Sequence, residues 1–262
     1  IYRIISGSFY KIAIIDGHRS FIGFDNFKKI FNSKYLLPIL SLTFRYTAFT
    51  LFLKLSLGFI TALFLNSDMY FSKVLKFLTL LPWAVQQVAV AVVWKWIFDG
   101  NYGYLNFYLQ KIGLLHENIS FLSNPTTAFF AASFVDAWLG IPMVAMIFIS
   151  GLSNINHSLY ESAKIDGAGV FMRFIHITCP CIKRVFFVTV TLVGIWTFNS
   201  FNVIFVLTGG GPMRSTETLM LKIYEEAFSK FDLGVAYALS CLVVGILFIF
   251  TFIYCLMNKE DT

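Results

Sequence analysis

The sequence predicts an all-α membrane protein, a bundle of transmembrane helices linked by polar loops. Of its 262 residues, 58% are hydrophobic and 13% are charged, whereas soluble domains average about 25% charged residues. Its mean hydropathy is +0.74, and its 31 Phe and 12 Tyr suit a bilayer better than a soluble core. The net charge of +6 comes from bases scattered between apolar blocks. Such scattering fits the flanks of membrane spans and argues against a nucleic-acid-binding protein.

Five apolar stretches are long enough to cross a bilayer, which takes about 20 helical residues. The last two contain no charged residue at all. We therefore predict one transmembrane domain over residues 1–262, with complete spans at about 41–65, 77–98, 126–149, 185–207 and 233–257.

Residues 1–15 are too short and too polar to span a bilayer alone. Because the chain opens on Ile and not on Met, we interpret this stretch as the tail of a truncated first span. A removed signal peptide is the alternative, although no cleavage-site pattern is visible.

The distribution of lysine and arginine between loops normally indicates the orientation of the chain in the membrane, but here it does not decide between the two orientations. Segments 66–76, 150–184 and the C-terminal tail hold seven such residues, and segments 16–40, 99–125 and 208–232 hold eight.

Charged and polar residues inside the spans are functional candidates, because they are costly in lipid. Lys54 lies in the middle of the 41–65 stretch. It either lines a cavity and attracts an anionic group or pairs with Asp136, which is also near mid-span. Arg45 is a second hint of an anionic substrate.

The segment "ESAKIDGAGVFMRFIHITCP" at 161–180 is a polar, glycine-containing loop between apolar stretches. Ser158 precedes Glu161 by the spacing of a capping box, and Gly167 and Gly169 interrupt the helical pattern. We predict a short helix, a glycine turn at Gly167 and a second short helix. Such a pair fits a groove on a partner protein, or it lies on lipid headgroups as an ordinary interfacial loop.

This segment resembles the EAA motif of the membrane subunits of ABC importers. Glu161-Ser162-Ala163, then Gly167 and Ile177 to Pro180, keep the spacing of the family pattern, with Ser162 and Cys179 as mild departures. The "IDGAG" at 165–169 is similar to the sugar and glycerol-phosphate branch.

Four further stretches carry the same resemblance. They are "GFDNFKKIF" at 23–31, "LLPWAVQQVAVAVVWKWIF" at 80–98, "WLGIP" at 138–142 and "LTGGGP" at 207–212. The resemblance implies the type I ABC importer permease fold, a cytoplasmic 150–184 loop and an external GGGP turn. It also implies location in a bacterial or archaeal cytoplasmic membrane.

In this family the EAA loop forms coupling helices that dock into a cleft of an ATP-hydrolysing subunit. The implied ATPase-coupling residues are Glu161, Ser162, Ala163, Asp166, Gly167, Ala168, Ile177 and Pro180. The implied partners are a second homologous permease, an ATPase dimer, an external solute-binding protein and membrane lipid, with no nucleic acid. Whether the permease pair is homodimeric or heterodimeric stays open.

We expect no enzymatic activity, cofactor or metal in this chain, with ATP and Mg bound by the partner ATPase. No G-x-x-x-x-G-K-[ST] phosphate loop occurs, and Gly209–Gly211 fit an external turn better. The four cysteines show neither zinc-ligand spacing nor a disulfide framework, and we interpret them as small apolar fillers.

Maltose-type permeases place their sugar site at the W-L-G-x-P region and at a polar cluster before the GGP loop. By position this implies a substrate path with Trp138, Leu139, Gly140, Thr197, Asn199 and Ser200. Val193 and Met143 stand where that site has polar side chains, which argues against maltose itself.

We therefore expect a permease subunit that forms half of the pathway for a sugar, a di- or oligosaccharide. Glycerol 3-phosphate is the alternative substrate within the family. From another class, a secondary transporter or channel would also be a helical bundle with polar mid-span residues, but the EAA spacing argues against it.

Overall fold

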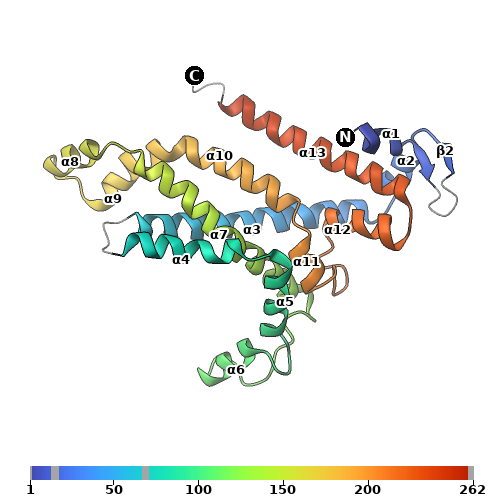
Figure 1. Ribbon diagram of the computed structural model, residues 1–262, viewed down its shortest axis with the longest axis horizontal. Helices are drawn as coiled ribbons and strands as arrows, with labels where there is room; N and C mark the ends of the chain where they lie inside the picture. The colour runs from blue at the N-terminus through green and yellow to red at the C-terminus, as the bar shows by residue number, and fades with distance from the viewer. Residues whose placement is uncertain (1, 13–17, 67–70, 259–262) are drawn as a thin grey trace. The chain divides into compact units, whose positions relative to one another are not determined.

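The chain folds as two compact units, and two long helices, Leu36–Leu65 and Pro125–Ser153, contribute residues to both. Figure 1 shows the helices and strands of the chain. The computed structural model describes residues 2–12, 18–66 and 71–258. Parts of the predicted first-span tail (1 and 13–15), the 66–76 loop (67–70) and the C-terminal tail (259–262) lie outside the described residues. Unit 1 comprises Ile1–Ala48, Gln87–Ser133 and Phe198–Thr262, and unit 2 comprises Phe49–Gln86 and Phe134–Thr197.

Unit 1 is built from helices and one small β-hairpin. One hydrophobic cluster joins α2 and the first part of α3 to α12 and α13, and Ile39, Leu219 and Leu239 are among its buried members. The elements are α1 (Tyr2–Gly7), β1 (Tyr10–Ile12), β2 (Arg19–Phe21), α2 (Asp25–Phe31), the start of α3 (Leu36–Leu65), α5 (Gln87–Ile97), α6 (Tyr104–Lys111), the start of α7 (Pro125–Ser153), α11 (Asn202–Leu207), α12 (Leu219–Tyr224), the π-helix η2 (Glu225–Ser229) and α13 (Leu233–Asn258).

The regular elements in the described part of unit 2 are all helices. Val144 and Phe148 of α7 form its core with Ala62 of α3 and Ile182 of α10. Gly58 lets α3 approach α7 closely, since a Cβ there would lie 2.5 Å from the side chain of Val144. The elements are the rest of α3 and α7, α4 (Ser72–Ala84), α8 (His157–Ile165), α9 (Val170–Arg173), the π-helix η1 (Phe174–Thr178) and α10 (Cys179–Phe198).

Four helical segments among the described residues have the length and hydropathy of membrane spans: Leu36–Leu65, Pro125–Ser153, Val170–Leu207 and Leu233–Leu256. A fifth candidate is the broken pair formed by α4 and α5. The sequence predicted an unbroken helix at 77–98, but the structure interrupts it at Val85 and Gln86. It also interrupts the predicted 185–207 span at residues 199–201.

The first residues differ from the expected single helical tail. Only Tyr2–Gly7 are helical, and Tyr10 then pairs with Phe21 in an antiparallel hairpin. The buried Asn26 of α2 ties this region together, because its Nδ2 donates to the carbonyls of Ser8 (2.8 Å) and Tyr10 (3.1 Å). The sequence pattern missed the hairpin because its strands are only three residues long.

Candidate coupling and transport sites

The segment between α7 and α10 folds as the predicted helix, turn and helix. The end of α8 is closed by two backbone hydrogen bonds, Ala168 N–H to the Ala163 carbonyl (2.8 Å) and Gly167 N–H to the Lys164 carbonyl (3.1 Å). This pair of bonds is a Schellman motif, which places a left-handed residue after the helix. Gly167 occupies that position with φ +80°, so the predicted glycine turn is confirmed.

The predicted capping box at the start of α8 is wrong. The helix begins at His157, and its N-cap is Asn156, whose side chain accepts a 3.0 Å bond from Ser158 N–H. Asn is among the preferred N-cap residues, and its position puts Ser158 inside the first turn. Glu161 instead lies 3.2 Å from His157 Nδ1 across one turn of exposed helix.

The remaining predicted coupling residues lie on the same loop. A 2.8 Å hydrogen bond between the hydroxyls of Tyr160 in α8 and Thr178 in η1 holds its two halves together. Ala163, Ala168 and Ile177 are half-buried, whereas Ser162, Asp166 and Pro180 are exposed. The loop thus presents its acidic and small residues on one folded piece (α8 and α9 in Figure 1).

Large apolar side chains on this loop face outward. Ile165 is 87% exposed, and Val170 and Phe171 are 77% and 76% exposed. We call Leu159, Ile165, Val170, Phe171 and Met172 the coupling surface. Exposed apolar residues gathered on one loop mark a site of contact with another surface.

Polar residues gather where the predicted 185–207 span is interrupted. Asn199 and Ser200 lie in the non-helical break between α10 and α11, and both are half-buried. Non-helical backbone at membrane depth is tolerated only where protein buries it or where it lines a water-filled cavity. Interrupted helices of this kind also form the binding sites of many transporters.

Two hydrogen bonds join α11 to α5 within unit 1. Asn202, the first residue of α11, donates from Nδ2 to Oε1 of Gln87, the first residue of α5, at 3.0 Å. Further along, Lys95 Nζ donates to the Val206 carbonyl at 3.2 Å. Helices α5 and α11 therefore run side by side in the same direction, with their N-termini together.

The other predicted path residues are more enclosed. Leu139 is 6% exposed and Thr197 only 1% exposed, while Trp138 and Gly140 are half-buried. Lys54 Nζ lies 2.9 Å from Asp136 Oδ1 and donates to Thr197 Oγ1 at 3.0 Å. Of the two interpretations of Lys54, the structure shows the pairing with Asp136. Arg45 is exposed and bonds the Ser41 carbonyl through Nε.

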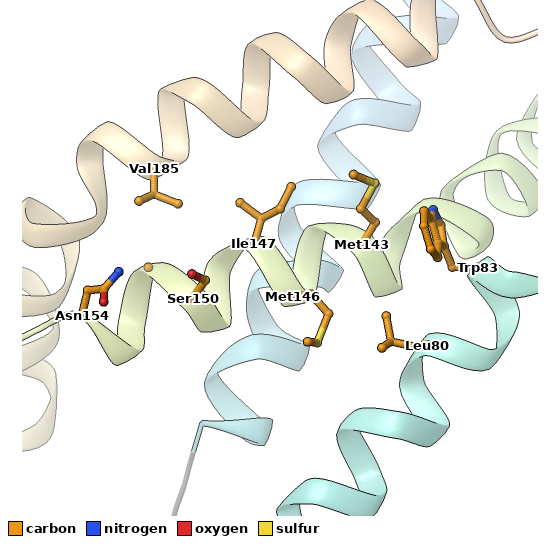
Figure 2. Close-up of a pocket in the computed structure, with 9 residues that line it drawn as sticks. Leu80, Trp83, Met143, Met146, Ile147, Ser150, Asn154 and Val185 are labelled. Atoms are coloured by element: carbon orange, nitrogen blue, oxygen red, sulfur yellow. The ribbon is translucent and has the colours of Figure 1, made fainter.

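A groove of about 600 Å³ in unit 2 runs along α7 (Figure 2). Leu80 and Trp83 of α4 lie near its Met143 and Met146 end, and Ser150 and Asn154 line the other end. None of the six predicted path residues lines this groove. The sequence had singled out only Met143, as an apolar replacement of a polar position.

The sequence analysis did not find a cluster of charged residues that follows the Gly209–Gly211 turn. Lys222 Nζ lies 2.7 Å from Glu225 Oε2, 3.2 Å from Glu226 Oε1 and 3.6 Å from Glu217 Oε1. Lys230 Nζ adds contacts of 2.8 Å to Glu226 and 3.3 Å to Glu225. The spacing of Lys222, Glu225, Glu226 and Lys230 at three and four residues was the available signal.

The cluster shifts the ionisation of its members in opposite directions. Burial raises the pKa of Glu217, and contact with Glu225 raises it further, against the attraction of Lys222 and Arg214. For Glu225, burial acts to raise the pKa, but hydrogen bonds from Lys222 and Glu217 outweigh it and lower the pKa to about 2. The hydrogen bond to Glu226 raises the pKa of Lys230 well above its ordinary value.

The described residues contain no group of three or more His, Cys, Asp or Glu side chains arranged to hold a metal ion.

Comparison with known proteins decides the family. Residues 54–260 match the family described as "binding-protein-dependent transport system inner membrane component". The chain belongs to this family. It is thus a multi-pass membrane permease of the ABC importer type.

Named relatives of this permease carry different cargoes. It is 32% identical over 236 residues to the trehalose/maltose transport system permease protein MalF of Thermococcus litoralis, covering 90% of this chain and 79% of that protein. It is also 32% identical over 249 residues to the sn-glycerol-3-phosphate transport system permease protein UgpA of Yersinia enterocolitica, covering 90% and 82%. The sulfoquinovosyl glycerol transport system permease protein SmoG of Agrobacterium fabrum is 30% identical and covers 97% and 82%.

The permease also matches a solved structure, a bacterial ABC transporter involved in the import of the acidic polysaccharide alginate. The TM-score is 0.86 at 21% identity, with 100% of this chain and 90% of that chain covered. This match establishes the fold of an ABC importer permease.

Proposed function

We propose that this permease forms half of a sugar translocation pathway, driven by ATP hydrolysis on a partner subunit that docks on α8 and α9. The observation that carries the proposal is the coupling surface, in which Ile165 is 87% exposed beside the Schellman turn at Gly167. An apolar surface on a rigid loop between two spanning helices fits a groove in a soluble partner. It moves α7 and α10 when that partner moves.

The substrate we favour is an uncharged di- or oligosaccharide. The Lys54 ammonium is already neutralised by Asp136 at 2.9 Å, so it offers no uncompensated charge to an anion. Asn199 and Ser200 at the helix break supply hydrogen-bonding groups suited to sugar hydroxyls, and Trp138 offers an aromatic face for a sugar ring. The similarity to UgpA, equal in identity to the similarity to MalF, keeps glycerol 3-phosphate as the second candidate.

The proposed assembly contains this permease, a second homologous permease, an ATPase dimer and an external solute-binding protein in a bacterial or archaeal cytoplasmic membrane. One solved relative is described in complex with an alginate pentasaccharide-bound periplasmic protein. In this assembly ATP and Mg are bound by the ATPase, and the permease performs no covalent chemistry.

The docking proposal is tested by Phe171→Ser and Ile165→Ser in the full complex. We expect both to reduce the amount of ATPase retained on purification, because each removes apolar contact area from the coupling surface. Phe31→Ser is the matched control, since Phe31 is 65% exposed but lies on α2, in the 16–40 segment that is grouped with the external GGGP turn and not with the 150–184 loop. Unchanged ATPase retention in both coupling-surface variants would contradict the proposal.

The substrate proposal is tested on the cognate solute-binding protein by calorimetry with trehalose, maltose and glycerol 3-phosphate. We expect binding of a neutral sugar and none of glycerol 3-phosphate. The reverse result would select the second candidate.

A further inference from the structure

We propose that Lys54 is a positioning residue for transport, which holds α3, α7 and α10 together within unit 2. We call the 150–184 segment between α7 and α10 the coupling loop. Through the contacts of Lys54, movement of this loop is transmitted to the C-terminal end of α10. This inference rests on the proposed function, because it describes how docking at α8 and α9 would reach the substrate path.

The geometry at Lys54 joins three helices through one ammonium group. Lys54 of α3 is 5% exposed, Asp136 of α7 is 7% exposed and Thr197 of α10 is 1% exposed. The ammonium lies 2.9 Å from Asp136 Oδ1 and 3.0 Å from Thr197 Oγ1. Thr197 Oγ1 donates its own proton to the Val193 carbonyl at 2.8 Å, so the same oxygen is an acceptor toward Lys54.

Gly140 makes room for this arrangement. It follows Asp136 by one helical turn, so the two residues share a face of α7. A Cβ at position 140 would lie 2.7 Å from Cε and 2.8 Å from Cδ of Lys54. The lysine stem therefore lies directly on the α7 backbone, and the glycine of the WLGIP stretch is explained by this close approach.

Lys54, Asp136 and Thr197 lie close in sequence to points where the chain passes from one unit to the other. The chain passes between the two units at Ala48–Phe49, Ser133–Phe134 and Thr197–Phe198, as well as between Gln86 and Gln87. Lys54, Asp136 and Thr197 each lie on the unit 2 side, close to one of the first three crossings. The coupling loop belongs wholly to unit 2.

In lipid, the hydrophobic effect does not hold helices together, so packing and polar contacts must do so. A charge-assisted contact that holds three helices of unit 2 makes these helices move together. Without the Lys54 contact, the docked partner could displace α7 and α10 independently of each other. The end of α10 at Phe198, directly before Asn199, would then not follow the coupling loop.

The test uses the purified complex in proteoliposomes and measures the ratio of solute-stimulated to basal ATPase activity at equal ATPase retention. Lys54→Met with Asp136→Asn removes both charges and leaves no uncompensated ion in the span. We expect this ratio to fall by about tenfold, the size of a typical coupling between sites. A purely structural pair would lower the thermal stability of the complex and leave the ratio of the assembled complexes unchanged, which would overturn the inference.

A second set of variants decides the matter if the charge-free double variant does not assemble. Thr197→Val removes the acceptor for Lys54 and keeps the shape, and we expect it to lower the ratio, while Thr197→Ser should restore it. Thr189→Val is the matched control, because Thr189 is equally buried on α10 and its hydroxyl donates to the Val185 carbonyl of the same helix. Equal ratios for Thr197→Val and Thr189→Val would overturn the inference.

The inference and the proposed function fail in different ways. If Asn199→Leu and Ser200→Leu transport normally while the Lys54 variants are uncoupled, the path is misplaced and the role of Lys54 stands. If the unmodified complex shows no solute stimulation of ATP hydrolysis, the proposed function fails and this inference fails with it.

Discussion

Gln87 and Asn202, separated by 115 residues in the chain, join two half-helices by a hydrogen bond of 3.0 Å. Each is the first residue of a helix that follows a break in a predicted span. We expect Gln87→Leu and Asn202→Leu each to reduce transport. Their effects should not add, because each removes the same bond. A double-mutant cycle on transport rates should give a coupling of about 0.6 kcal/mol, the average for such bonds in membranes. Fully additive losses would show that the bond has no role.

Asn199 and Ser200 lie in the break before α11. Asn199→Leu and Ser200→Leu should impair uptake while the ATPase still co-purifies, since the break is remote in sequence from α8 and α9. Thr251→Leu on α13 is the control, because Thr251 is an exposed polar residue of a continuous helix. Normal uptake by both break variants would place the path elsewhere, for instance along the groove at Met143.

Gly167 adopts φ +80°, and a Cβ there would meet no atom within 4 Å. Backbone strain is therefore the main cost of substitution, about 1 kcal/mol for Ala. The loss of solute-stimulated ATPase activity should increase from Gly167→Asn to Gly167→Ala to Gly167→Val, because Asn tolerates the left-handed region best. A series ordered by side-chain volume alone, with Asn worse than Ala, would contradict the strain argument.

Glu161 forms an exposed pair with His157 at 3.2 Å, and this contact is its intrachain role. Such pairs contribute at most about 1 kcal/mol, so Glu161→Ala should leave the stability of the permease nearly unchanged. We expect weaker ATPase retention and lower stimulated hydrolysis, because the exposed carboxylate is available to a basic residue of the partner. His157→Ala removes the same intrachain pair and is the control. If both variants behave alike, Glu161 has no partner outside the chain.

The Lys222 cluster predicts a pH dependence of stability. Glu217 has a folded pKa above its ordinary 4.5, so its contribution is fully present below pH 4.5 and is lost as the pH rises through the raised pKa. Gln cannot ionise, so Glu217→Gln should gain unfolding temperature relative to the unmodified permease as the pH rises above 4.5. Unfolding curves of the detergent-solubilised proteins across this range test the sign. A constant difference at all pH values would contradict it.

Glu225 should behave in the opposite way. Its folded pKa of about 2 lies below the ordinary 4.5, so its contribution is present above pH 4.5 and disappears as the pH falls toward 2. Glu225→Gln should therefore destabilise the permease at neutral pH and have a shrinking effect in acid. The same unfolding series measures it. Lys28 and Asp25 form an exposed pair elsewhere, and its disruption by Asp25→Asn should change little.

The sequence alone determined the class of the protein, most of its long helices and the conformation at Gly167. These follow from local chemistry: stretches of about 20 apolar residues favour spanning helices, and a glycine after an amphipathic turn favours a left-handed cap. The EAA spacing placed the loop that carries the coupling surface. The predicted capping box was wrong because Asn156 is also a favourable N-cap residue, and the helix begins directly after it, before Ser158.

Only the tertiary structure decided which partner Lys54 takes, where the predicted spans break and which polar residues meet. Lys54 is 82 residues from Asp136 and 143 from Thr197, so no local pattern encodes their contact. The breaks at Val85–Gln86 and 199–201 likewise interrupt stretches whose composition alone favours continuous helix. The apolar pattern of a segment indicates that it spans the membrane. Which partner a buried charge takes depends on the helices that pack around it. The sequence therefore left two interpretations of Lys54, and the fold shows that it pairs with Asp136.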